Sequence, residues 1–152
     1  MQLDRRWIAE HIPHAGRMCL LDEVLGWDLN HIRCSTSTHR NPDNPLRAYG
    51  RLGSACGIEY AAQAMAIHGA LVAVTAPTGY IAAVRAVTLL VQRLDDIGSD
   101  LIARADRVSS DGTTALYEFS LSSAEKQLLT GRATIVFDLA ASPLTSTPTA
   151  NP

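Results

Sequence analysis

The feature that most constrains this chain is a long apolar stretch that carries a single formal charge. Between Leu52 and Val84 only Glu59 is charged, and residues 54–74 are dominated by alanine and other good helix formers. Ser54 is a suitable N-cap residue for a helix that begins there. A helix that is apolar on all sides must be buried in a protein core or must cross a membrane.

A membrane span does not suit this helix. Spanning needs about 20 consecutive apolar residues, whereas this stretch contains Glu59, Gln63 and His68. Segments of strand character also lie on both sides of it. We therefore expect a long helix buried in the core of a protein that does not bind membranes.

The segments around the predicted helix favour strands. Before it we expect one short helix and two strands, over residues 4–12, 17–29 and 32–39. A loop rich in Asn and Pro, at residues 41–45, separates them from the long helix. After the long helix we expect four strands joined by short turns, over residues 80–93, 101–108, 114–122 and 127–139.

This order of elements predicts the architecture. Strands joined by short turns pair antiparallel, and the central helix is the one apolar element available to cover their sheet. The sequence therefore predicts an α+β hot-dog fold over residues 1–139, in which a curved antiparallel sheet wraps around one long helix. Residues 140–152 are rich in Ser, Thr and Pro, which predicts a disordered tail. Because exposed sheet edges favour association, we expect a homodimer or a heterodimer with another hot-dog subunit.

Composition argues against several classes of function. The 152 residues carry a net charge of −2, which favours binding neither to nucleic acid nor to an anionic membrane surface. The three cysteines fit no zinc or CxxC spacing, and we expect reduced thiols in a cytoplasmic protein without a secretory signal. The chain has no glycine-rich phosphate loop, no serine elbow and no histidine–carboxylate cluster of metal-ligand spacing. We therefore expect no metal and no cofactor.

Glu59 is the most informative candidate for chemistry. An unpaired buried carboxylate is costly, so this side chain could be a protonated or hydrogen-bonded acid that faces a cavity and serves as a general acid. It could equally be a solvated carboxylate that the helix N-terminus favours, and the residues alone leave both open. Gln63 shares the helix face of Glu59, whereas His68 points to the opposite face and is expected to be a hydrogen-bonded core histidine.

Two segments resemble the 3-hydroxyacyl-[acyl carrier protein] dehydratases, which are hot-dog enzymes. Residues 12–24 read Ile-Pro-His-Ala-Gly-Arg-Met-Cys-Leu-Leu-Asp-Glu-Val and resemble the family's opening motif. Residues 57–65 read Gly-Ile-Glu-Tyr-Ala-Ala-Gln-Ala-Met and resemble its central-helix motif. The likeness covers most of residues 10–139. Together with residues 39–46, it is closest to the dehydratase-like proteins of aryl-polyene pigment synthesis.

The resemblance implies a reaction. In the family, a histidine removes the C2 proton of a 3-hydroxyacyl thioester, and an acid on the central helix of the other subunit helps to expel the 3-hydroxyl as water. Glu59 matches that acid. Backbone N–H groups near the start of the helix, at Ser54, Cys56 and Gly57, would polarise the thioester carbonyl.

The catalytic histidine is the point at which this sequence departs from the family. The family carries it shortly before the helix, in a segment that here, at residues 48–54, is shorter and has no histidine. His39 is the best substitute, because it stands at the start of the loop that leads to the helix. We therefore expect Glu59 and His39 to be catalytic, and Gln63 and His14 to contact the substrate.

The resemblance also implies partners. The substrate would be an acyl chain linked through phosphopantetheine to an acyl carrier protein, which is acidic. Arg40, Arg47 and Arg51 are candidates to bind the carrier protein, and ordinary solvated arginines are the alternative. The missing histidine favours a related subunit that completes the site. Two alternatives to a dehydratase stay open: a hot-dog thioesterase in which a helix carboxylate attacks or activates water, and a non-catalytic partner subunit.

Overall fold

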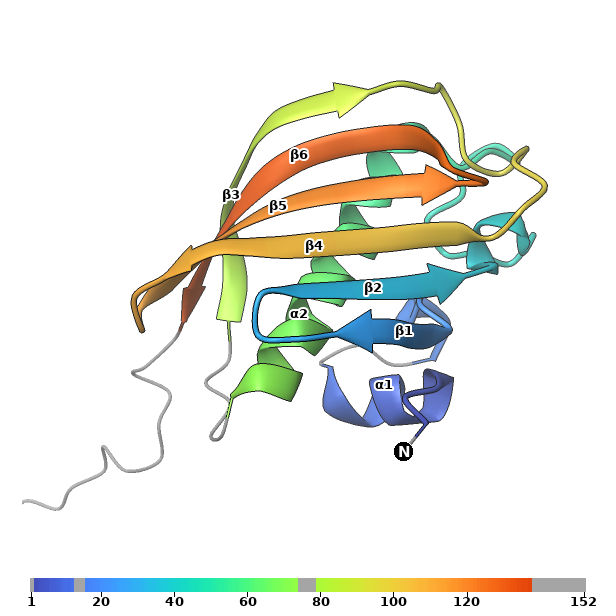
Figure 1. Cartoon of the computed structure of the whole chain (residues 1–152). Helices are drawn as coiled ribbons and strands as arrows, with labels where there is room; N and C mark the ends of the chain where they lie inside the picture. The colour runs from blue at the N-terminus through green and yellow to red at the C-terminus, as the bar shows by residue number, and fades with distance from the viewer. Residues whose placement is uncertain (1, 13–15, 74–78, 138–152) are drawn as a thin grey trace, which may run out of the picture.

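The computed structural model describes residues 2–12, 16–73 and 79–137 of the chain. Within these ranges two strands precede one long helix, and four strands follow it (Figure 1). The elements are α1 (Arg5–His11), β1 (Glu23–Trp27), β2 (His31–Thr36), α2 (Gly57–Val72), β3 (Gly79–Leu89), β4 (Leu101–Ser110), β5 (Thr114–Ser123) and β6 (Lys126–Phe137). Short 3-10 helices lie between them: η1 (Gly16–Met18), η2 (Thr38–Arg40) and η3 (Ser54–Cys56).

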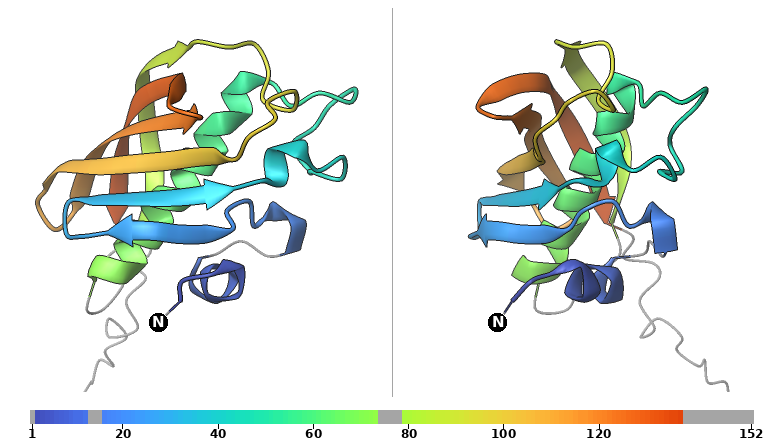
Figure 2. Two further views of the ribbon diagram at one scale, coloured as in Figure 1. Left: turned by 45° about the vertical axis from the view of Figure 1, so that its right-hand side comes forward. Right: turned by 90° about the vertical axis from the view of Figure 1, so that its right-hand side faces the viewer.

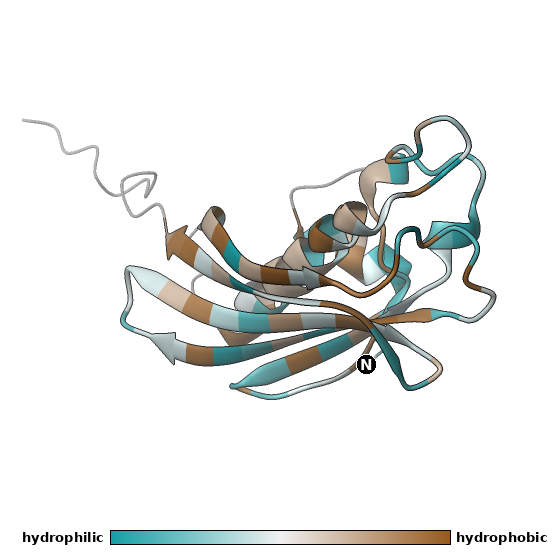
Figure 3. Cartoon of the chain, turned by 90° about the horizontal axis from the view of Figure 1, so that it is seen from above, coloured by the Kyte–Doolittle hydropathy of each residue, from teal (hydrophilic) through white to brown (hydrophobic). Residues whose placement is uncertain are grey.

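The six strands form one sheet that curves around α2 (Figure 1). Their order is β1-β2-β4-β5-β6-β3, and every neighbouring pair is antiparallel. Along β4, β5 and β6 apolar residues face the helix and polar residues face away, which appears as alternating bands in Figure 3. The predicted α+β hot-dog fold is confirmed.

Helix α2 lies directly on the sheet at its N-terminal end. A Cβ atom on Gly57 would stand 2.4 Å from Cδ2 of Leu129 on β6 and 2.9 Å from Cδ2 of Leu121 on β5. Glycine therefore allows a close approach of the helix to the strands, which any larger residue would achieve only by displacing these leucine side chains.

The predicted strand over residues 17–29 is wrong in its first part. The chain forms η1 there, and β1 begins at Glu23. The three consecutive residues before Asp22 are all buried: Cys19, Leu20 and Leu21. The backbone of this segment bonds the Gln63 side chain of α2 instead of a neighbouring strand, through the Leu20 N–H and the Met18 carbonyl.

The other predicted boundaries are closer. Strand β2 ends at Thr36 instead of residue 39, because the hydroxyls of Thr36 and Thr38 both donate to the carbonyl of Leu20, at 2.5 and 2.7 Å. The predicted helix over residues 54–74 begins with η3 and continues as α2. Strand β3 ends at Leu89 instead of residue 93.

No helix in the described ranges is both long and apolar enough to cross a membrane. The predicted disordered tail lies outside the described residues, so its state stays a prediction.

Candidate active site

Two connecting segments meet beside the N-terminal end of α2 (Figure 2). One runs from β2 to α2, and the other runs from β3 to β4. Backbone N–H groups of Leu52 and Ser54 in the first donate to Asp95 Oδ1 and the Gln92 carbonyl in the second, at 2.8 and 3.0 Å. The Arg93 guanidinium bonds the Asp95 carboxylate and holds its pKa well below the usual range. The two segments therefore form one bonded unit at this end of the helix.

His39 lies at the centre of this unit, in η2, and is fully buried. Its Nε2 atom is 3.0 Å from the carbonyl oxygen of Ile97. A carbonyl can only accept, so Nε2 carries the hydrogen and Nδ1 carries the lone pair of the neutral ring. Burial lowers the pKa of His39, which keeps the ring neutral. Nδ1 is buried and has no hydrogen-bond partner among the described residues.

Side chains of the same loop hold the backbone around His39. Asn44 Nδ2 donates to the carbonyl of Thr38 at 2.9 Å, and Arg47 donates to the carbonyl of His39 at 3.1 Å. Arg47 also donates to the carbonyl of Gly50 at 3.4 Å. The imidazole therefore sits on a loop whose peptide groups are fixed on both sides.

The three arginines expected to bind a carrier protein differ in their surroundings. Arg40 forms an ion pair with Asp100 at 2.8 Å. Arg47 is half-buried and its two terminal nitrogens donate to loop carbonyls. Arg51 is exposed. Arg51 is therefore the most accessible of the three to a docking partner.

Glu59 lies in the first turn of α2 and is half-exposed. Its neighbour on the same face, Gln63, is fully buried. The Gln63 side chain accepts from the Leu20 N–H at 2.8 Å, donates to the Met18 carbonyl at 2.7 Å and approaches Glu59 Oε1 at 3.4 Å. Gln63 thus holds residues 18–20 against α2 beside Glu59. This structural role was not predicted; the sequence suggested only a contact with substrate.

The backbone amides expected to polarise a thioester carbonyl have acceptors within the chain. The N–H of Ser54 donates to the Gln92 carbonyl and that of Cys56 donates to the Gly53 carbonyl, both at 3.0 Å. The N–H of Gly57 donates to carbonyls of η3. Each of these three N–H groups at the start of the helix therefore already bonds a carbonyl of the same chain.

Two further histidines, His68 and His31, bond groups outside this unit. His68 is buried, with Nδ1 2.6 Å from the Tyr117 hydroxyl and Nε2 2.8 Å from the Asp28 carbonyl, as a hydrogen-bonded core histidine. His31 pairs with the Asp28 side chain at 2.9 Å. His14, predicted to contact the substrate, lies outside the described residues. No cluster of three or more metal-binding side chains occurs in the ranges that the structure describes.

Sequence reasoning missed two polar residues beside His39. Tyr60 is fully buried in α2, and Asn44 is buried in the loop; the Asn44 amide donates to the Tyr60 hydroxyl at 2.9 Å. Tyr60 stands in an apolar helix, where its position alone does not distinguish it from a core residue. The signal that could have identified it is the phenol group itself, because a buried hydroxyl requires a partner.

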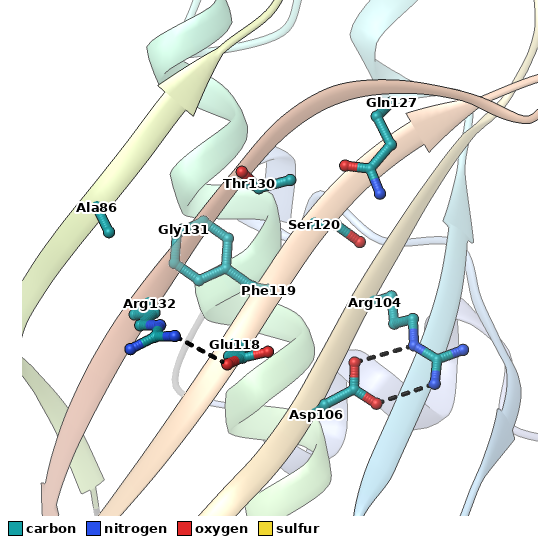
Figure 4. A pocket seen from close by; sticks show the side chains of 10 residues that line it. All are labelled: Ala86, Arg104, Asp106, Glu118, Phe119, Ser120, Gln127, Thr130, Gly131 and Arg132. Atoms are coloured by element: carbon teal, nitrogen blue, oxygen red, sulfur yellow. Dashed lines mark hydrogen bonds and ion pairs between the residues drawn. The ribbon is translucent and has the colours of Figure 1, made fainter.

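A hollow of about 380 Å³ lies on the face of the sheet turned away from α2 (Figure 4). Its charged groups already form pairs, Arg104 with Asp106 at 2.9 Å and Arg132 with Glu118 at 3.3 Å. The hollow therefore presents no concentrated charge, and it is separated by the sheet from the loop that carries His39.

The chain is similar to known dehydratases. A family model described as ApeP-like, ApeP dehydratase, matches residues 6–142. A chain of the dehydratase heterocomplex ApeI:P from Xenorhabdus doucetiae is 25% identical, with a TM-score of 0.74 over 86% of this chain and 90% of that chain. No curated protein sequence matches.

Other solved structures share the fold at lower identity. Zebrafish thioesterase superfamily member 2 is 19% identical, with a TM-score of 0.64 over 88% of this chain and 93% of that one. The PaaI protein of the Escherichia coli phenylacetic acid degradation operon is 12% identical, with a TM-score of 0.62 over 87% and 88%. These likenesses concern the fold alone.

Proposed function

This chain belongs to the ApeP-like dehydratase family, and we propose that it is one subunit of a 3-hydroxyacyl-[acyl carrier protein] dehydratase in aryl-polyene synthesis. The acyl group would be carried on phosphopantetheine. The observation that carries the proposal is His39, a fully buried neutral imidazole whose Nδ1 lone pair has no partner in the described part of the chain. An unpaired buried acceptor is costly and calls for an explanation, and the role that we assign to Nδ1 is that of a general base.

In the proposed reaction, His39 Nδ1 takes the proton from C2 of the 3-hydroxyacyl thioester. The electron pair of that C–H bond forms the C2–C3 double bond, and the C3–O bond breaks. Glu59 acts as the general acid and gives a proton to the departing hydroxyl, which leaves as water. The products are a trans-2-enoyl thioester and water, and the proton on His39 returns to Glu59 before the next turnover.

Strand β3 is the proposed contact with a second hot-dog subunit. It is 11 residues long, lies at the edge of the sheet and pairs with β6 on one side. Large apolar side chains on it and just after it are exposed: Tyr80, Val84, Leu89 and Leu90. A long apolar edge strand is a template for pairing with another sheet, and the similar ApeI:P structure is a heterocomplex.

The test is to incubate the chain, alone and with the hot-dog dehydratase subunit of its own organism, with a 3-hydroxyacyl-carrier-protein thioester. Mass spectrometry of the acyl group would report the loss of water. We expect that loss with the partner present. Glu59→Gln should abolish it, whereas Glu118→Gln, a matched change on the outer face of the sheet, should leave it intact.

Other outcomes would overturn the proposal. Release of a free acid would identify a thioesterase. Loss of water that is unaffected by both Glu59→Gln and His39→Gln would leave this chain as a non-catalytic partner. Replacing Val84 with Asp should separate the two subunits in size-exclusion chromatography if β3 is the interface.

A further inference from the structure

A chain of hydrogen bonds links helix α2 to the loop that carries η2. The Tyr60 hydroxyl receives a hydrogen bond from Asn44 Nδ2 at 2.9 Å and lies 2.8 Å from Thr38 Oγ1. Thr38 Oγ1 in turn donates to the carbonyl of Leu20 at 2.7 Å. Three segments that are distant in sequence are therefore joined at one phenol group.

The donors and acceptors fix the direction of these bonds. The amide N–H of Asn44 can only donate, so the Tyr60 oxygen accepts it. The Tyr60 hydrogen then points to Thr38 Oγ1, whose own hydrogen goes to the Leu20 carbonyl. Burial raises the pKa of Tyr60, so the phenol keeps its proton throughout the neutral range. Each of these hydrogen-bonded groups thus has a defined role as donor or acceptor and one orientation.

These hydrogen bonds reach the peptide group that precedes His39, and Arg47 holds the one that follows it. Asn44 Nδ2 also donates to the Thr38 carbonyl, which belongs to the peptide bond that precedes His39. Arg47 holds the carbonyl of His39 itself, and Ile97 holds the ring at Nε2. Rotation of the imidazole would require at least one of these bonds to break.

Tyr60 also follows Glu59 directly in α2. One residue of the helix therefore carries the proposed acid, and the next anchors the loop that carries the proposed base. We infer that Tyr60 is a positioning residue: acting through Asn44 and Thr38, it fixes the loop that carries the His39 imidazole against α2. This inference rests on the proposed dehydratase function. A misplacement of about 1 Å can cost about 100-fold in rate, so modest freedom of the loop would be visible in turnover.

The test compares Tyr60→Phe with Tyr117→Phe in the assembled dehydratase. Tyr117 is a matched control, because it is also buried and its hydroxyl also bonds a buried side chain, His68. Both changes remove one buried phenol oxygen and should lower stability similarly. Tyr60→Phe should lower kcat on the order of tenfold with KM nearly unchanged, whereas Tyr117→Phe should leave kcat unchanged. Equal losses of kcat in the two variants, or none in Tyr60→Phe, would overturn the inference.

A second measurement requires no activity and separates this inference from the function on which it rests. Nitrogen-15 NMR of labelled histidines in the complex reports the tautomer of each ring, and His39→Gln assigns the signal of His39. We expect a single Nε2–H tautomer for His39, which Tyr60→Phe shifts or broadens and Tyr117→Phe leaves unchanged. An unchanged His39 signal in Tyr60→Phe would show that Tyr60 does not position the ring. Absence of dehydration by the unmodified complex would instead contradict the proposed function.

Discussion

Among the described residues, two histidines are fully buried, one at each end of α2. His39 lies beside the N-terminal end, and His68 lies in the last turns of the helix. Each holds Nε2 on a backbone carbonyl, that of Ile97 at 3.0 Å and that of Asp28 at 2.8 Å. Burial lowers the pKa of both. They differ at Nδ1, which is 2.6 Å from the Tyr117 hydroxyl in His68 and has no partner in the described chain in His39.

The proposed catalytic role of His39 rests on this difference. Burial and a lowered pKa are common to both rings, so neither property distinguishes them. The distinguishing property is a lone pair left without a partner at a cost in stability of about 1–3 kcal/mol. His68 satisfies both nitrogens and completes the core, whereas His39 leaves Nδ1 without a partner in the described part of the chain, and this is the atom that we propose as the base.

The largest expected effect is on activity. His39→Gln should lower kcat/KM of the assembled dehydratase by about 10²–10⁴-fold, because general-base catalysis contributes about that much. Glutamine can still donate to the Ile97 carbonyl, so the loop should keep its conformation. His68→Gln is the matched change and should leave kcat/KM within about twofold, since nothing in the proposed reaction uses it. Steady-state assays of both variants decide, and similar losses in the two would remove the distinction between the histidines.

The second effect is on stability and has the opposite order. His68→Gln should lower the free energy of unfolding by about 1–3 kcal/mol, because it disturbs two satisfied bonds in the core. His39→Gln should cost less, because it removes an unpaired acceptor together with the ring. Urea unfolding followed by circular dichroism measures both. A greater loss of stability in His39→Gln than in His68→Gln would indicate that His39 is the structural residue.

The fold could be predicted from the sequence more fully than the site. The apolar helix around Glu59 and the strand order set the architecture, because few arrangements can bury such a helix. The run of Cys19, Leu20 and Leu21 was assigned to a strand, because apolar composition does not reveal that Gln63 pins this segment to α2.

The site was harder to predict because its properties depend on single atoms. The position of His39 in a loop suggested a role, but its unpaired Nδ1 and its bond to Ile97 come from segments that are distant in the chain. Arg47 and Arg51 look alike in sequence and differ in burial. Tyr60 was indistinguishable from a core residue until the partners of its hydroxyl were known.

The third effect is a pH dependence of stability that the two histidines should share. A histidine whose pKa is lowered by folding binds fewer protons in the folded chain than in the unfolded chain below about pH 6.5. Stability should therefore fall as the pH drops below that value, with a slope of at most about 1.4 kcal/mol per pH unit for each histidine. Unfolding free energies at pH 7.5, 6.0 and 5.0 measure the slope. Both His39→Gln and His68→Gln should make it shallower, and a slope unchanged in both would show that other groups dominate.

The smallest expected effects concern Arg47 and Arg51. As with the two histidines, the comparison is between two residues of one type; here one of them is bonded within the protein and the other is exposed. Arg47 donates to the carbonyls of His39 and Gly50, whereas Arg51 is exposed. Arg51→Gln should raise KM for the carrier-protein substrate a few-fold, because an exposed cation attracts an acidic partner. The rise should be larger at low salt, because salt screens the attraction between exposed charges. Arg47→Gln should instead lower kcat a few-fold with KM unchanged, because it releases the carbonyl of His39 and loosens the ring.

Kinetics at low and high ionic strength separate these two roles. A salt-dependent rise of KM in Arg47→Gln would mean that its guanidinium leaves the loop to meet the carrier protein. The loop would then rely on Asn44 and Ile97 alone to hold His39. A fall in kcat that is independent of salt would place Arg47 with Tyr60 among the groups that orient the base, and it would leave docking to residues such as Arg51 at the surface.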